Sequence, residues 1–327
     1  MRIRPCLLLA VGLLSAAPTL HADRLDPARA ARLAEAERAI AAERWDDAQA
    51  ILDELAGGLE VEEPVLAARL ELALRRAGLR GAEGAAGGVP ADVESAAAAL
   101  ERHPAPGHRT CVLLADEAPA AGNLDAAASW LTRAIQARPD DDASRLRLAL
   151  LQMERGKPGD AATAALELVQ RQPRCAGFLQ LAGQGLLADG RVTAAIPVLE
   201  RLVEVDADNA EARSLLGTAL LVERRMEEAV GQLREAARLE PTPVRQANLG
   251  LALIYLGRTD EALELLGRLT TEHPEHGGGW INYGLALAGA GRLDEARAAL
   301  VRALELDPDD ERARANLADL DALTNKP

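Results

Sequence analysis

The chain has 327 residues, and its formal net charge is −14 because 51 acidic residues outnumber 37 lysines and arginines. Since phosphate-binding surfaces need basic patches, this acidic balance argues against nucleic acid as a partner. Aromatic residues make up only 2% of the chain, so surfaces that stack on sugars or bases are not expected either.

Residues 1–22 have the three parts of a secretory signal peptide. Arg2 and Arg4 give a positive start, residues 6–17 are apolar, and the segment ends on small residues at Ala22. The apolar run is shorter than the roughly 20 residues that a membrane-spanning helix needs. We therefore expect an exported protein, with the periplasm as its location, that meets a membrane only indirectly through envelope partners. An uncleaved signal that stays as an anchor is the alternative.

Residues 23–107 predict two irregular helical hairpins. The first covers about residues 29–62. The second has helical patterns at 64–77 and 91–103, separated by a glycine-rich segment at 78–91 that predicts a flexible loop. Because loops accept insertions at little cost, we interpret this segment as a surface insertion. A loop that gates a ligand site is the alternative.

Residues 108–310 repeat with a period of 34 residues and one step of 33. Alanine, glycine and proline each follow this period, at Ala127, Ala161, Ala195, Ala229, Ala262 and Ala296, at Gly183, Gly217, Gly250 and Gly284, and at Pro139, Pro173, Pro241, Pro274 and Pro308. Each unit holds two apolar-periodic segments of helix length, most often separated by a glycine that can end the first helix. Such a period indicates stacked helical hairpins.

The unit at 277–310 shows the pattern most fully, with Trp280, Tyr283, Gly284 and Ala296 at its fourth, seventh, eighth and twentieth positions. It resembles the tetratricopeptide repeat (TPR), and the same register fits units at 108–141, 142–175, 176–209, 210–242 and 243–276. The resemblance implies an all-α fold, an α-solenoid that forms a right-handed superhelix of about eight hairpins. Residues 311–327 resemble a first helix with no second helix after it, which predicts a C-terminal capping helix and tail.

No motif in the chain indicates catalysis. Phosphate-binding glycine loops, nucleophile elbows and paired metal-binding cysteines are all missing, so we expect a protein that is not an enzyme and has no cofactor or metal. His273 and His276 lie in an inter-repeat loop and are interpreted as solvated. Cys111 and Cys175 lie nearly two repeats apart, too far for a disulfide, and are interpreted as thiols.

Three of the six asparagines, Asn248, Asn282 and Asn316, occupy the sixth position of successive first helices. Asparagine inside a helix is less favourable than alanine by roughly 0.6 kcal/mol, so the repetition suggests a function. The pattern resembles the asparagine ladder in the TPR arm of O-linked N-acetylglucosamine transferases, which grips the backbone of extended peptides in the concave groove. That asparagine is simply common at this position is the alternative. Other expected groove residues are Gln180, Gln184, Ser214, Thr218, Leu251, Tyr255 and Leu285.

These features predict a non-enzymatic protein that binds an extended peptide segment of another protein in its groove. A second interpretation stays open, in which the chain is a structural scaffold or assembly factor of an envelope machine for polysaccharide export, secretion or cytochrome maturation. That role would use other faces of the solenoid. The partner itself is not identified by any motif.

Overall fold

The computed structural model describes residues 26–57, 63–80, 95–96, 98–100, 107–117 and 123–324. Every element in these ranges is helical, and they contain no strand. The chain forms two compact units, one up to Lys157 and one from Pro158 onward. The expected signal peptide at residues 1–22 lies outside the described residues.

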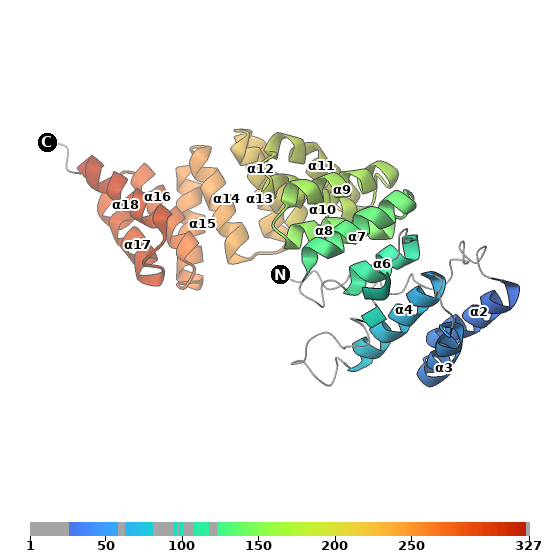
Figure 1. Cartoon of the computed structure of the whole chain (residues 1–327). Helices are drawn as coiled ribbons and strands as arrows, with labels where there is room; N and C mark the ends of the chain where they lie inside the picture. Colours follow the sequence, from blue (N-terminus) through green and yellow to red (C-terminus); the bar gives the residue numbers. More distant parts are fainter. Residues whose placement is uncertain are drawn as a thin grey trace. The chain divides into compact units, whose positions relative to one another are not determined.

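The first unit contains six described helices (Figure 1). They are α2 (Pro27–Ala41), α3 (Trp45–Leu55), α4 (Glu63–Arg80), α6 (His108–Glu117), α7 (Leu124–Ala137) and α8 (Asp142–Glu154). The pair formed by α2 and α3 spans 27–55, where the first irregular hairpin is expected at about 29–62. Leu52 and Leu72 are buried in the core that joins this pair to α4.

The glycine-rich segment at 78–91 was expected to be a loop throughout, and this is wrong for its first three residues. Helix α4 continues through Arg80. A single glycine costs a helix only about 1 kcal/mol relative to alanine, and leucine and arginine, which follow Gly78, both favour helices. Residues 81–91 lie outside the described part of the chain.

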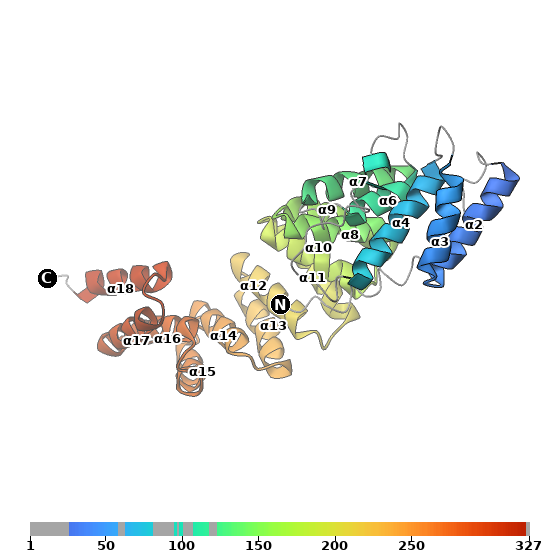
Figure 2. The ribbon, with the colours of Figure 1, turned by 60° about the horizontal axis from the view of Figure 1, so that its bottom comes forward.

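The second unit is a regular series of antiparallel helix pairs (Figure 2). Its helices are α9 (Pro158–Arg171), α10 (Ala176–Ala188), α11 (Val192–Val205), α12 (Ala210–Val222), α13 (Met226–Leu239), α14 (Pro243–Tyr255), α15 (Thr259–Glu272), α16 (Gly277–Gly289), α17 (Leu293–Leu306) and α18 (Glu311–Thr324). The division between the two compact units falls inside the repeat at 142–175, between α8 and α9. The all-α solenoid architecture expected from the repeat is confirmed.

The turns inside the repeats at 142–310 depend on a left-handed residue two positions after the last residue of the first helix. Gly156, Gly190, Gly257 and Gly291 have φ between 69° and 80° there. Arg224 occupies the equivalent position in the fourth regular repeat with φ 62°. Glycine takes this conformation without the steric cost that a side chain brings, which explains why it recurs at this position.

The helices of the second unit form two layers. The first helices of the repeats are α10, α12, α14, α16 and α18, and the second helices are α9, α11, α13, α15 and α17. Successive first helices contact one another, most extensively α14 with α16, whereas contacts between successive second helices are few or absent in the described residues. The first helices are therefore the closer-packed layer, as expected for the inner side of a curved stack.

Candidate functional site

Helix α14 shows which side of the first helices is open. Leu249 and Leu253 are buried in the core that includes Leu233 of α13. Gly250 packs against Leu266 of α15. These residues face the second helices, so the opposite side of α14 is not covered by that layer.

The open side of α14 carries four residues at spacings of four, three and four. Val244 is 57% exposed and Tyr255 is 58% exposed, while Asn248 and Leu251 between them are half-buried. At 100° per residue these side chains fall within an arc of about 60°. They form one stripe along the helix, which we call the α14 stripe.

The edges of the α14 stripe meet the neighbouring first helices. On one side Arg245 forms an ion pair with Glu211 of α12 at 3.4 Å. On the other side the Asn282 side-chain amide of α16 donates a hydrogen bond to the Ala247 carbonyl at 2.9 Å. The stripe therefore lies on the free surface of the first-helix layer. We call the free surface of α10, α12, α14 and α16 the first-helix face.

The three asparagines at the sixth repeat position all lie half-buried on their first helices. Asn282 is engaged within the stack, because its amide nitrogen binds the carbonyl of Ala247 on the preceding first helix. In the described part of the chain no such bond is seen for Asn248 or Asn316. An asparagine amide can both donate to and accept from a peptide unit, so these two have the capacity for a ligand.

The remaining expected groove residues lie on α10, α12 and, for the half-buried Leu285, α16. Gln180 and Gln184 are half-buried on α10, while Ser214 is half-buried and Thr218 exposed on α12. The Thr218 hydroxyl donates to the Ser214 carbonyl at 2.9 Å, within its own helix. A role for these residues in binding stays a prediction.

Two exposed apolar residues on this layer were not expected from the sequence. Val222, at the end of α12, is 61% exposed, and Val244 begins the α14 stripe. Val222 holds the thirteenth position of its repeat, which is also the position of Tyr255. A comparison of equivalent repeat positions would have suggested Val222 once Tyr255 had been selected.

The first-helix face is nearly free of charge. Helices α10 and α16 contain no charged residue, and the one in α14, Arg245, is buried. In α12 the charges are Glu211, which pairs with Arg245, and Arg213, which donates to the Ala207 carbonyl at 2.8 Å. The acidic residues of this unit therefore lie mainly on its second helices and connecting turns.

The first helices of the N-terminal unit are different, because charged residues link them to one another. Arg109 of α6 donates to Glu37 of α2 and to Glu71 of α4. Arg147 of α8 donates to Asp116 of α6. Burial raises the pKa of the Asp116 carboxyl above its ordinary value, although Arg147 opposes the shift. These helices thus contrast in chemistry with α10, α12, α14 and α16 of the second unit, whereas its last helix, α18, is charged.

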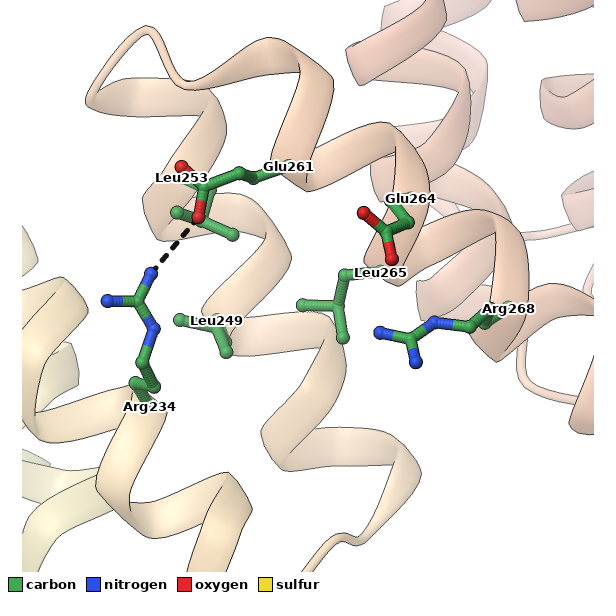
Figure 3. Close-up of a pocket in the computed structure, with 7 residues that line it drawn as sticks. All are labelled: Arg234, Leu249, Leu253, Glu261, Glu264, Leu265 and Arg268. Atoms are coloured by element: carbon green, nitrogen blue, oxygen red, sulfur yellow. Dashed lines mark hydrogen bonds and ion pairs between the residues drawn. The ribbon is translucent and has the colours of Figure 1, made fainter.

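A shallow pocket of about 190 Å³ lies on the opposite side of the second unit (Figure 3). The leucine side chains at its base lie between Arg234 of α13 and Arg268 of α15, and Arg234 pairs with Glu261 at 3.3 Å. The lining residues are Arg234, Leu249, Leu253, Glu261, Glu264, Leu265 and Arg268. Exposed acid and base pairs around an apolar base make this a weak site for a small molecule.

The loop histidines have a structural position. His276 is the N-cap residue that precedes α16, and its Nδ1 accepts a hydrogen bond from the Gly279 backbone N–H at 2.9 Å. His273 lies 3.4 Å from Glu275. The described residues contain no group of three or more His, Cys, Asp or Glu side chains placed to hold a metal ion. Cys111 is buried and Cys175 half-buried, and both are thiols.

The capping role of His276 predicts a pH-dependent stability. Burial and then the neighbouring His273 lower the pKa of its imidazole below the ordinary value of 6.5. As the pH falls below 6.5, His276 becomes protonated in the unfolded chain before it does so in the folded chain. The stability that the neutral imidazole contributes above that pH is therefore lost. Removing such a cap costs about 1 kcal/mol.

Urea unfolding at pH 7.5 and 5.0 measures this effect. On going to pH 5.0, His276→Asn should lose less stability than the wild-type protein, because asparagine keeps a capping side chain that does not titrate. An equal loss in both proteins would contradict this role.

Comparisons with known proteins agree with the repeat architecture. Family models described as tetratricopeptide repeat match residues 112–178, 181–242 and 253–321, which together make up more than half of the chain. No curated protein matches the chain in sequence. None of the helices in the described residues is long and apolar enough to cross a membrane.

Several solved structures are similar to the chain. A tetratricopeptide repeat protein from Parabacteroides merdae is 15% identical with a TM-score of 0.53, over 67% of this chain and 94% of that protein. YrrB, a TPR protein with an unusual peptide-binding site, is 22% identical with a TM-score of 0.48, over 57% of this chain and 97% of its own. MamA from Desulfovibrio magneticus is 19% identical with a TM-score of 0.46, over 50% of this chain and 93% of that protein.

Proteins with this fold generally act as non-catalytic scaffolds for protein–protein interaction, and a protein or peptide is the expected class of partner. The helix pairs, the left-handed turn residues and the matched repeats all lead to the same conclusion. The chain belongs to the tetratricopeptide repeat family.

Proposed function

We propose that this protein is a non-enzymatic binding protein whose first-helix face holds an extended segment of another protein. The observation that carries the proposal is the free surface of α14 between α12 and α16. It presents an asparagine with no partner within the described chain, next to exposed apolar side chains. Such a surface can satisfy a peptide backbone and bury side chains at the same time.

Asn248 on the first-helix face and Asn316, at the equivalent position of the adjoining first helix α18, supply the test of backbone binding. Replacing both with alanine should weaken partner recovery at least about tenfold, because hydrogen bonds to a desolvated peptide would be lost. Asn282 is left intact, since its amide also links α16 to α14. The measurement is affinity purification of the tagged full chain from the producing cells, with quantification of the partner by mass spectrometry.

A matched control is Gln170→Ala, which removes an exposed amide from α9 in the second-helix layer. Its partner recovery should equal that of the wild-type protein. If Asn248→Ala with Asn316→Ala recovers the partner equally well while remaining folded, the two asparagines do not grip the segment.

We further propose that the protein works outside the cytoplasm, with the periplasm as its compartment. The support is the sequence of residues 1–22, in which Arg2 and Arg4 precede an apolar stretch and a small residue at Ala22. Amino-terminal sequencing of the protein from fractionated cells should give a periplasmic chain that starts at Asp23. A cytoplasmic protein that retains Met1 would contradict export.

The scaffold role has its own structural feature, the pocket between α13 and α15 on the second-helix side. An envelope assembly that used this side would be sensitive to Arg268→Glu and insensitive to the asparagine changes. The same affinity purification therefore separates the two functions. Loss of the partner with Arg268→Glu alone would favour the scaffold.

A further inference from the structure

Exposed apolar residues are concentrated on two adjacent first helices. Among the described residues, the large apolar side chains that remain exposed are Val222, Val244 and Tyr255 on α12 and α14, and Val301 on α17. Single exposed apolar residues are normal on any protein. Three of them on neighbouring helices of one layer form a patch, which is the feature that marks an interaction surface.

The geometry of the repeat brings these residues onto one surface. Val222 and Tyr255 are the last residues of α12 and α14, and these helices contact each other. Val244 lies at the other end of the α14 stripe, eleven residues before Tyr255, which is about 16 Å along the helix at 1.5 Å per residue. Leu251 and Asn248 fill the stripe between them.

An extended segment lying along this stripe would place about five residues over it, at roughly 3.3 Å per residue. Successive side chains of such a segment point to opposite sides, so two or three of the five would meet α14. The apolar surface available to them is that of Val244, Leu251 and Tyr255, with Val222 adjacent. Covering these side chains removes apolar surface from water, which favours binding.

The surroundings would not tolerate a charged side chain at this contact. The α14 stripe itself carries no charged side chain, and Arg245 at its edge already pairs with Glu211 at 3.4 Å and with Glu240 at 3.0 Å. The exposed charges next to the patch are Glu223 and Arg224, which follow Val222 at its margin. A partner charge placed over the stripe would lose its hydration without gaining a counter-charge, which is strongly unfavourable. The charged network of Arg109, Glu37 and Glu71 belongs to the first helices of the other compact unit.

We infer that the segment bound by this protein has an uncharged apolar core of about five residues that covers Val222, Val244 and Tyr255. The inference rests on the proposed function, because it takes the first-helix face as the binding surface. It adds the chemistry of the partner. The occupant is an aliphatic or aromatic stretch of an extended polypeptide, with charged residues confined to its flanks.

Selection from a phage library of random twelve-residue peptides tests this inference. The immobilised full chain should enrich peptides with an aliphatic or aromatic core and no charge within it. The variant with Val222→Ser, Val244→Ser and Tyr255→Ser should reduce their recovery at least about tenfold, since three apolar side chains would no longer be buried by the peptide. Val301→Ser, an exposed valine on a second helix, is the matched control and should change nothing.

The outcomes separate the inference from the proposed function. Enrichment of peptides with charged cores, or equal enrichment by the triple-serine variant with its helical content intact, would overturn the inference and leave peptide binding in place. Failure of the wild-type chain to enrich any peptide would contradict both. Enrichment of apolar cores that depends on the three residues, and not on Val301, would establish the inference.

Discussion

Gly217→Ala is expected to lower the free energy of unfolding by about 1–3 kcal/mol. A Cβ atom at Gly217 would lie 2.5 Å from Cγ of Leu233 and 3.3 Å from the Ala229 backbone oxygen. Both belong to α13, the partner of α12 in the same repeat. The Leu233 side chain and the backbone of α13 would have to shift away from α12. The close contact between the two layers would loosen as a result.

Gly231→Ala in the same repeat is the matched control. Gly231 is exposed in the middle of α13, and an added Cβ would have no atom within 4 Å. Alanine is the better helix former there, so stability should rise by up to about 1 kcal/mol. Urea unfolding followed by circular dichroism measures both variants. Shifts of the midpoint in the same direction would contradict the close approach of α12 and α13.

Arg109→Met should destabilise the N-terminal unit by about 1–2 kcal/mol, because charge-assisted hydrogen bonds to two carboxylates are lost. Arg109 donates to Glu37 of α2 and to Glu71 of α4, so it ties three helices together. Methionine keeps the length and apolar stem of the side chain. The change therefore removes the charge with little loss of packing.

A conservative variant identifies the cause. Arg109→Lys keeps a positive charge near Glu37 and Glu71 and should recover part of the lost stability. Urea unfolding of wild type, Arg109→Met and Arg109→Lys measures this. Equal losses of stability in the two variants would show that packing, not charge, was lost.

The repeat architecture could be predicted from the sequence because each of its signals is local. The alanine and glycine positions that allow helices to approach, such as Gly250 against Leu266, recur at a fixed spacing. The glycines that end the first helices recur in the same way, and Gly190 and Gly257 take the left-handed conformation that the pattern requires. A signal repeated in several units is hard to misread.

The candidate site was predictable only in part, because exposure depends on contacts between repeats. Asn282 could not be separated from Asn248 in the sequence, since its hydrogen bond is to a backbone carbonyl on the previous first helix. Val222 and Val244 were missed because valine normally indicates a core position. Their exposure follows from the side of the helix on which they lie, which the structure shows directly.

The contrast in charge between the two sets of first helices was readable in the sequence but needs the layers to be recognised. Over the whole chain the acids exceed the bases, which by itself suggests a uniformly acidic surface. Only when α10 and α16 are known to lie in one layer does their lack of charge become a property of a surface. That surface is where we place the partner.

Photo-crosslinking from two positions tests this placement most directly. A photoreactive amino acid is introduced in place of Tyr255 on the first-helix face or Val301 on α17, and the producing cells are irradiated before mass spectrometry of the adducts. Both positions are exposed, at 58% and 42%, so both can react. We expect one polypeptide to be crosslinked at residue 255 and absent at residue 301. The same adduct at both positions, or at residue 301 alone, would contradict a partner bound on the first-helix face.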